Sequence, residues 1–139
     1  MAIDQGLTTS FKQQMLQGQQ DLSSDTLKMA LYTGLADLGA DTTAYTSTNE
    51  VSGTGYVAGG QTMSGVSISA TTNGTVYVNF DNVVWNPAAF TARGALIYNV
   101  TQSNASVAVL DFGADKTCTN TFTVTMPANT STTALLRFS

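Results

Sequence analysis

The chain contains no histidine and a single cysteine, and both facts restrict its chemistry. Without histidine it cannot build a Ser-His-Asp triad, a histidine-bound zinc site or an imidazole proton shuttle. Its one cysteine, Cys118, can form neither an internal disulfide nor a thiolate metal cluster. The threonine-rich surroundings of Cys118 favour a small buried apolar residue over a catalytic thiolate. We therefore expect a protein that is not an enzyme, with no catalytic residues, no cofactor and no metal.

Charge is also scarce, because Asp, Glu, Lys and Arg make up 10% of the chain and the formal net charge is -4. Neutral polar residues take their place, and threonine, serine, asparagine and glutamine together exceed a third of the sequence. The five cations are scattered and form no basic patch in the sequence: Lys12, Lys28, Arg93, Lys116 and Arg137. Since nucleic-acid binding depends on clustered Lys and Arg, we expect no nucleic-acid partner.

Long apolar runs are missing as well, and no basic segment followed by an apolar run stands at the N-terminus. Membrane-spanning helices need about 20 predominantly apolar residues, and secretory signals need both of those features. We therefore expect no membrane partner and synthesis in the cytoplasm.

The length of 139 residues is typical of one domain, so residues 1–139 are expected to share a single core. A helix is predicted over residues 7–22, with Ser10 and Gln13 as a capping box and Gly18 as a C-terminal stop. Residues 1–25 then form an N-terminal helical arm. Because this segment is short and weakly amphipathic, it is expected to lie against a larger body.

The remaining residues, 26–139, have the pattern of a β-protein. Residues 27–32 form a dense apolar run, typical of a strand covered on both faces. Residues 34–65 show no sustained period and are predicted to be a long ordered loop region. Alternation and turn signals then predict strands at 66–69, 75–80, 83–85, 91–98, 107–112, 122–126 and 135–138, with turns at 73–74, 102–104, 113–115 and 128–130. The predicted fold is mainly β, an antiparallel β-sandwich of jelly-roll type.

Several groups have both a structural and a functional interpretation. The pairs Asp21/Asp25 and Asp37/Asp41 are better explained as solvated turns than as a calcium site, because no EF-hand pattern is present. Gly53, Gly55, Gly59 and Gly60 are better explained as turn positions of positive φ than as a phosphate loop. Core packing is favoured over sugar stacking for a set of five aromatic residues: Tyr45, Tyr56, Trp85, Phe90 and Tyr98.

Three parts of the sequence carry a family likeness: 9–18 leading into 27–34, then 43–60, then 80–85 followed by 91–99. Together they resemble small structural proteins of tailed bacteriophages, over about two thirds of the chain. The likeness is greatest to head decoration, or cement, proteins. Such proteins sit on the outside of the capsid and lock neighbouring major capsid subunits together, commonly as trimers. Beyond residue 100 the fold prediction depends on strand periodicity alone.

The resemblance implies a capsid-stabilising protein of the virion surface, with the major capsid protein and further copies of itself, as a homotrimer, as partners. Contacts are expected from the helix and from residues 41–60. The candidate contact residues are Phe11, Met15, Tyr45, Val51, Tyr56 and Val57. Alternatives are a tail, neck or fibre component, or a glycan-binding module on the virion. An enzyme with two carboxylates about 5–10 Å apart in a cleft is a third hypothesis.

Overall fold

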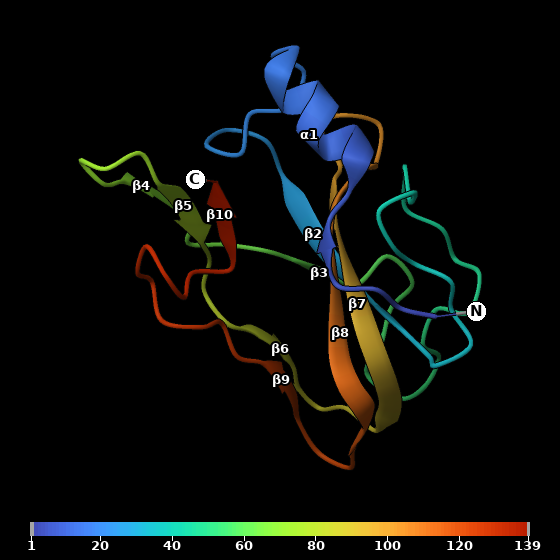
Figure 1. Cartoon of the computed structure of the whole chain (residues 1–139). Coiled ribbons are helices and arrows are strands. Elements are labelled where there is room, and N and C mark those ends of the chain that lie inside the picture. The colour runs from blue at the N-terminus through green and yellow to red at the C-terminus, as the bar shows by residue number, and fades with distance from the viewer. Residues whose placement is uncertain (1, 139) are drawn as a thin grey trace.

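The computed structural model describes residues 2–138, and within them the chain is mainly β, with antiparallel sheets and one short helix (Figure 1). In chain order the elements are β1 (Gly6–Leu7), α1 (Thr9–Leu16), β2 (Leu27–Tyr32), β3 (Gln61–Thr62), β4 (Ser67–Ala70), β5 (Val76–Asn79), β6 (Val83–Trp85), β7 (Phe90–Asn99), β8 (Ala105–Cys118), β9 (Phe122–Val124) and β10 (Leu136–Phe138). A central five-stranded sheet has the order β1-β8-β7-β2-β3, and the smaller sheets have the orders β10-β5-β4 and β6-β9. The predicted β-rich, antiparallel class is confirmed.

The central sheet is covered on both faces. Strand β2 pairs with β7 in continuous register, from Leu27 opposite Asn99 to Tyr32 opposite Gly94. Successive side chains of a strand point to opposite faces, so the strand contributes to two cores. Met29 and Leu31 join the core beside the smaller sheets, whereas Ala30 and Tyr32 join a core on the other face. This double coverage explains the continuous apolar run of residues 27–32, as the sequence predicted.

Two layers flank the central sheet. Figure 1 shows the smaller sheets on one side of it and the loop region 34–65 on the other. The first core is centred on large aromatic side chains such as Trp85 and Phe122, and Cys118 is buried in it as expected. The second core packs Leu96 and Val109 of the sheet against Leu38 of the loop. The loop region therefore serves as a packed layer of the fold.

Helix α1 is shorter than predicted. It begins after Thr8, whose Oγ1 accepts the Phe11 N–H at 3.3 Å, so Thr8 and not Ser10 is the N-cap. Its last residue is Leu16, and Gly18 follows at φ +70°, the left-handed conformation that ends helices. The prediction of a helix to residue 22 was therefore wrong, while the predicted stop at Gly18 is confirmed. Phe11 is fully buried, which holds α1 against the body.

A buried polar network fastens the N-terminal arm and the loop region to β8. Ser106, which is fully buried, shares a hydrogen bond of 2.8 Å with Thr8 through their hydroxyls. The Ser106 hydroxyl also donates to the Thr42 carbonyl at 2.7 Å, and Gln20 Nε2 donates to the Ser106 carbonyl at 3.3 Å. Because buried polar atoms are costly when unpaired, this network specifies where both segments lie.

Strand β8 runs through the turn that the sequence predicted at 113–115. Its register with β7 shifts between Ala92 opposite Lys116 and Gly94 opposite Asp111, which leaves an irregularity around Gly113 at φ +81°. A glycine in that conformation marks a bulge as readily as a turn, so the sequence alone could not distinguish them. The predicted turn at 102–104 is confirmed, with Ser103 and Asn104 at positive φ.

The predicted hairpin of residues 66–80 is present as β4 and β5, but the turn spans residues 71–75 instead of two residues. The apolar residues of this hairpin are unevenly buried: Val78 is buried, whereas Ile68 and Val76 stay 47% and 39% exposed. The apolar face of this hairpin is therefore only partly covered within the described residues.

Candidate functional site

Glu50 organises the loop region. One carboxylate oxygen, Oε1, accepts the Tyr45 hydroxyl at 2.7 Å. The other, Oε2, accepts the Tyr56 hydroxyl at 2.5 Å and the Gly59 N–H at 2.8 Å. Hydrogen bonds to a charged acceptor are stronger than neutral ones, so a single side chain joins three points of the loop. Glu50 is also the one glutamate of the chain.

The same cluster attaches the loop to the central sheet. The Tyr56 hydroxyl accepts the Leu31 N–H at 2.9 Å, in addition to donating to Glu50. Tyr98 of β7 stacks on Tyr45 with ring centroids 4.8 Å apart, and its hydroxyl donates to the Gly59 carbonyl at 2.6 Å. The loop is therefore held to the sheet by hydroxyl groups and backbone, with Glu50 at the centre.

Burial raises the pKa of four tyrosine hydroxyls in this layer: Tyr32, Tyr45, Tyr56 and Tyr98. The carboxylate of Glu50 raises these pKa values further, through a hydrogen bond to Tyr45 and Tyr56 and through its charge at the others. A neighbouring negative charge and a low-dielectric environment both disfavour the phenolate. The hydroxyls consequently stay protonated and act as donors.

Most of the predicted contact residues lie inside the monomer. Phe11 is fully buried and Val51 is 4% exposed, so neither presents a surface in this conformation. Tyr45 and Tyr56 are half-buried and bonded to Glu50, and Met15 packs against the first core. Val51 and Tyr56 both pack in the first core, so these two apolar residues of the loop region serve the packing of the fold.

Val57 differs from the other candidates, because it is 75% exposed. It stands at the start of a tight turn in which the Gly60 N–H donates to the Val57 carbonyl at 3.0 Å. Leu16, at the end of α1, is 91% exposed, and Leu35 in the loop region is 63% exposed. These are the three most exposed large apolar side chains of the described residues, and pattern analysis selected only Val57 among them.

An apolar groove of about 710 Å³ lies between α1 and the β4–β5–β10 sheet. Leu16 and Met15 line it from the helix, and Ile68 and Val76 line it from the hairpin. Lys12 and Asp21 stand among its lining residues. The groove is where the incompletely covered face of the hairpin meets the helix.

Several carboxylates that could have served a calcium site or a catalytic pair have structural roles instead. Asp21 caps a turn by accepting hydrogen bonds from Ser23 and Ser24, which lower the pKa of its carboxyl. Asp111 and Asp115 both pair with the Arg93 guanidinium, at 3.7 and 3.9 Å. No group of three or more metal-ligating side chains is found within residues 2–138. Nor does any helix in that range have the length and apolar character needed to cross a bilayer.

The aromatic residues confirm the core interpretation. Trp85, Phe90 and Tyr98 are 1%, 7% and 3% exposed, so none offers a free ring face for a sugar. Tyr56 packs against Trp85 and Phe90 with ring centroids 6.2 and 5.7 Å apart. The positive-φ interpretation is confirmed for Gly55, Gly59 and Gly60 but was wrong for Gly53, which does not adopt a positive φ.

Comparison with known proteins returns no match of any kind: no protein-family model, no curated protein and no solved structure is similar to this chain. The functional argument therefore depends on the residues themselves. Sequence analysis missed Glu50 and Ser106. The signal for Glu50 was available, because the one glutamate of the chain stands within a segment that carries two tyrosines.

Proposed function

We propose that this chain is a structural protein of a bacteriophage virion, which binds the outside of the capsid and stabilises it by bridging neighbouring major capsid subunits. Its proposed location is the capsid surface, and its proposed form on the particle is a homotrimer. The likeness of residues 9–99 to phage structural proteins supports this role. A mainly β body with few charges is compatible with it.

The observation that carries the proposal is the position of the most exposed apolar side chains. Leu16 and Val57 lie in the helix and in the loop 41–60, the two segments assigned to contacts, and Leu35 lies a few residues before that loop. Interface centres are depleted in charge and enriched in large apolar groups. Burying one such side chain is worth about 1.5–3 kcal/mol, so two or three anchors supply a useful part of the binding free energy.

We also propose the finer architecture, a β-sandwich of jelly-roll type. The two smaller sheets face the central sheet across the first core, which supports a sandwich on that side. On the other side, the loop region 34–65 takes the place of a further sheet.

The direct test uses Val57→Asp, because Val57 is exposed and makes no contribution to the buried cores. The purified protein is mixed with expanded capsids of the phage that encodes it, and binding is measured by cosedimentation. Loss of an apolar anchor and burial of an unpaired charge should weaken capsid binding at least about tenfold. Analytical ultracentrifugation of the same samples measures the trimer.

The matched control is Val84→Asp, the same change at a 45% exposed valine on β6, outside both contact segments. It should leave capsid binding unchanged. Absence of wild-type binding to capsids refutes the proposal. Equal binding by the wild type and Val57→Asp refutes the assignment of the loop to the interface. Cryo-electron microscopy of the virion separates a head position from a tail, neck or fibre position.

A further inference from the structure

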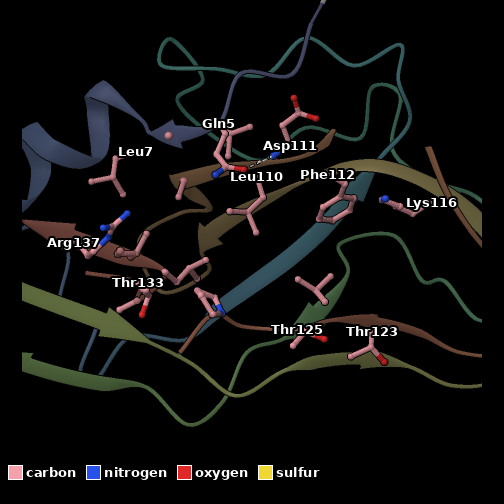
Figure 2. Close-up of a pocket in the computed structure, with 18 of the residues that line it drawn as sticks. Gln5, Leu7, Leu110, Asp111, Phe112, Lys116, Thr123, Thr125, Thr133 and Arg137 are labelled. Carbon is pink, nitrogen blue, oxygen red and sulfur yellow. Dashed lines mark hydrogen bonds between the residues drawn. The ribbon is translucent and has the colours of Figure 1, made fainter. Parts of the chain in front are cut away.

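A second, larger groove of about 1010 Å³ lies between the edge of the central sheet and the strands of the smaller sheets (Figure 2). One wall is formed by β1 and by β8 from Ala108 to Phe112. The other is formed by β9, by Thr125 and by the segment 133–137 that leads into β10. Figure 2 shows Leu110 and Phe112 on the first wall, facing Thr123 and Thr125 on the second.

The lining of this groove is apolar at its centre. Leu7, Leu110, Phe112 and Leu135 line it and are only partly buried. Behind them Phe122 and Val124 belong to the first core. The first core therefore opens towards the solvent along this side of the molecule.

Open strand edges flank the groove. Strand β8 pairs with β1 through Ala108 and Val109. Beyond them the Asp111 N–H donates to Gln5 Oε1 at 3.0 Å and the Gly113 N–H donates to Asp111 Oδ1 at 2.9 Å, so the open edges are those of β9 and β10. Strand β9 pairs with β6 alone, and β10 pairs with β5 alone, so in the described part of the chain each keeps a second edge unpaired. Unpaired edges offer rows of backbone N–H and C=O groups, and an extended segment of another chain can satisfy them.

The charged residues that line the groove have a net positive charge, whereas the whole protein has a net negative charge. Three charged residues line it, namely Asp111, Lys116 and Arg137. Asp111 is paired with Arg93, whereas Lys116 and Arg137 have no carboxylate within salt-bridge distance among residues 2–138. In Figure 2 these two cations stand towards opposite ends of the groove. Two of the five cations of a chain with net charge -4 are therefore placed here.

We propose that this groove binds an extended strand of a partner protein, with alternating apolar side chains in its middle and carboxylates towards its ends. The apolar side chains fill the space beside Leu110 and Phe112, the backbone pairs with an open edge, and the carboxylates meet Lys116 and Arg137. Naming a protein strand as the occupant rests on the proposed function, in which this chain works by contact with other proteins.

The test uses a synthetic peptide as the probe, acetyl-Glu-Val-Thr-Val-Thr-Val-Glu-amide carrying a fluorophore, titrated with the full chain and followed by fluorescence anisotropy. We expect saturable binding that weakens as salt is added. A control peptide, N-methylated at its three valines and two threonines, lacks the interior backbone donors of both strand edges and should not bind. A second control peptide with lysine in place of both glutamates should bind more weakly.

On the protein, the double variant Lys116→Glu with Arg137→Glu should weaken binding of the acidic peptide at least about tenfold, because like charges then meet. Lys12→Glu changes an exposed cation outside this groove and should leave binding unchanged. Thr125→Trp, at an exposed lining position, should block the groove without removing any core atom. Thermal unfolding of each variant confirms that it is folded.

The inference is overturned by absence of saturable binding up to about 1 mM protein, a limit near 4 kcal/mol of binding free energy. It is also overturned if the N-methylated peptide binds equally well, or if the charge-reversed and Thr125→Trp variants bind like the wild type. Capsid cosedimentation is scored separately. Peptide binding without capsid binding refutes the proposed function and leaves the groove assignment in place, and the reverse result does the opposite.

Discussion

Removal of the Glu50 side chain should destabilise the whole protein, although Glu50 lies in a region with little regular secondary structure. In Glu50→Ala the Tyr56 hydroxyl and the Gly59 N–H lose the acceptor that now lies 2.5 and 2.8 Å away. The Tyr56 hydroxyl cannot simply turn elsewhere, because its oxygen also accepts the Leu31 N–H at 2.9 Å. Both donors are part-buried, so hydrogen bonds to water do not fully replace the two bonds to Glu50.

The expected magnitude follows from those contacts. A hydrogen bond to a charged group contributes about 1.5–3 kcal/mol, and the Tyr45 bond is discounted because that side chain reaches solvent. Two bonds then give a loss of about 3–6 kcal/mol, a large fraction of the roughly 5–15 kcal/mol that stabilises a domain. For a chain of this size the melting temperature should fall by about 10–20 °C.

Glu50→Gln is the matched control. Its amide oxygen can accept from Tyr56 and Gly59, and its amide nitrogen can donate to the Tyr45 hydroxyl, so the geometry is kept and only the charge is lost. We expect a loss of about 1–1.5 kcal/mol. A double-mutant cycle of Glu50→Ala with Tyr56→Phe should show a coupling of at least about 1 kcal/mol.

Urea unfolding, followed by tryptophan fluorescence of Trp85, measures these free energies, since Trp85 is buried and packs against Tyr56. The slope against urea should be unchanged if the loop is part of the cooperative unit. A loss below about 1 kcal/mol for Glu50→Ala, or additivity with Tyr56→Phe, would refute the view that Glu50 holds the loop to the sheet.

Two further predictions concern the same layer. Because folding raises the pKa of the four tyrosine hydroxyls, and most clearly those of the more buried Tyr32 and Tyr56, the folded state binds more protons than the unfolded state above about pH 10, so stability that is present at lower pH is lost as the pH rises through 10; urea midpoints from pH 7 to 11 measure this, and a flat profile contradicts it. Gly60→Ala should cost about 3 kcal/mol or more, because a Cβ at φ +82° would lie 1.8 Å from the Met29 carbonyl oxygen. Gly74→Ala, at φ +99° in open space, should cost only about 1 kcal/mol in thermal unfolding, and equal losses for the two variants would contradict the close approach.

Strands with a strong local pattern could be predicted from the sequence, and those defined by distant contacts could not. Strand β2 matches the prediction for residues 27–32, because an unbroken apolar run needs a cover on both faces. Strand β8 was predicted too short, because its exposed half, around Gly113 and Ala114, has no alternation and pairs with β7 only through tertiary context. The helix was predicted to start at residue 7 but begins after Thr8, because the Thr8 hydroxyl caps it and bonds to Ser106, a partner that is distant in the sequence. At the other end it stops at Leu16, before the predicted end at residue 22, and Gly18 follows at φ +70°.

The candidate contact residues also show that local pattern can be predicted from the sequence and distant contacts cannot. Isolated apolar residues in an irregular loop were assigned to a partner, yet Val51 and Tyr56 pack in the first core of the chain itself. Periodicity describes helices and strands, and it carries no information on a loop whose order comes from one carboxylate and several tyrosine hydroxyls. The turn positions Gly59 and Gly60 were predictable, because positive φ is a local property.

The arrangement of the loop also bears on how Val57 can work as a contact. A mobile loop loses conformational entropy when it binds, at about 0.5–1.5 kcal/mol for each immobilised side chain and more for the backbone. Here Tyr56, directly before Val57, is fixed by its hydroxyl to both Glu50 and Leu31, and the turn that follows is closed by the Gly60 N–H. Val57 is therefore presented on a backbone that folding has already ordered. The hydrogen bonds that stabilise the monomer thus also lower the entropic cost of any contact made through this exposed side chain.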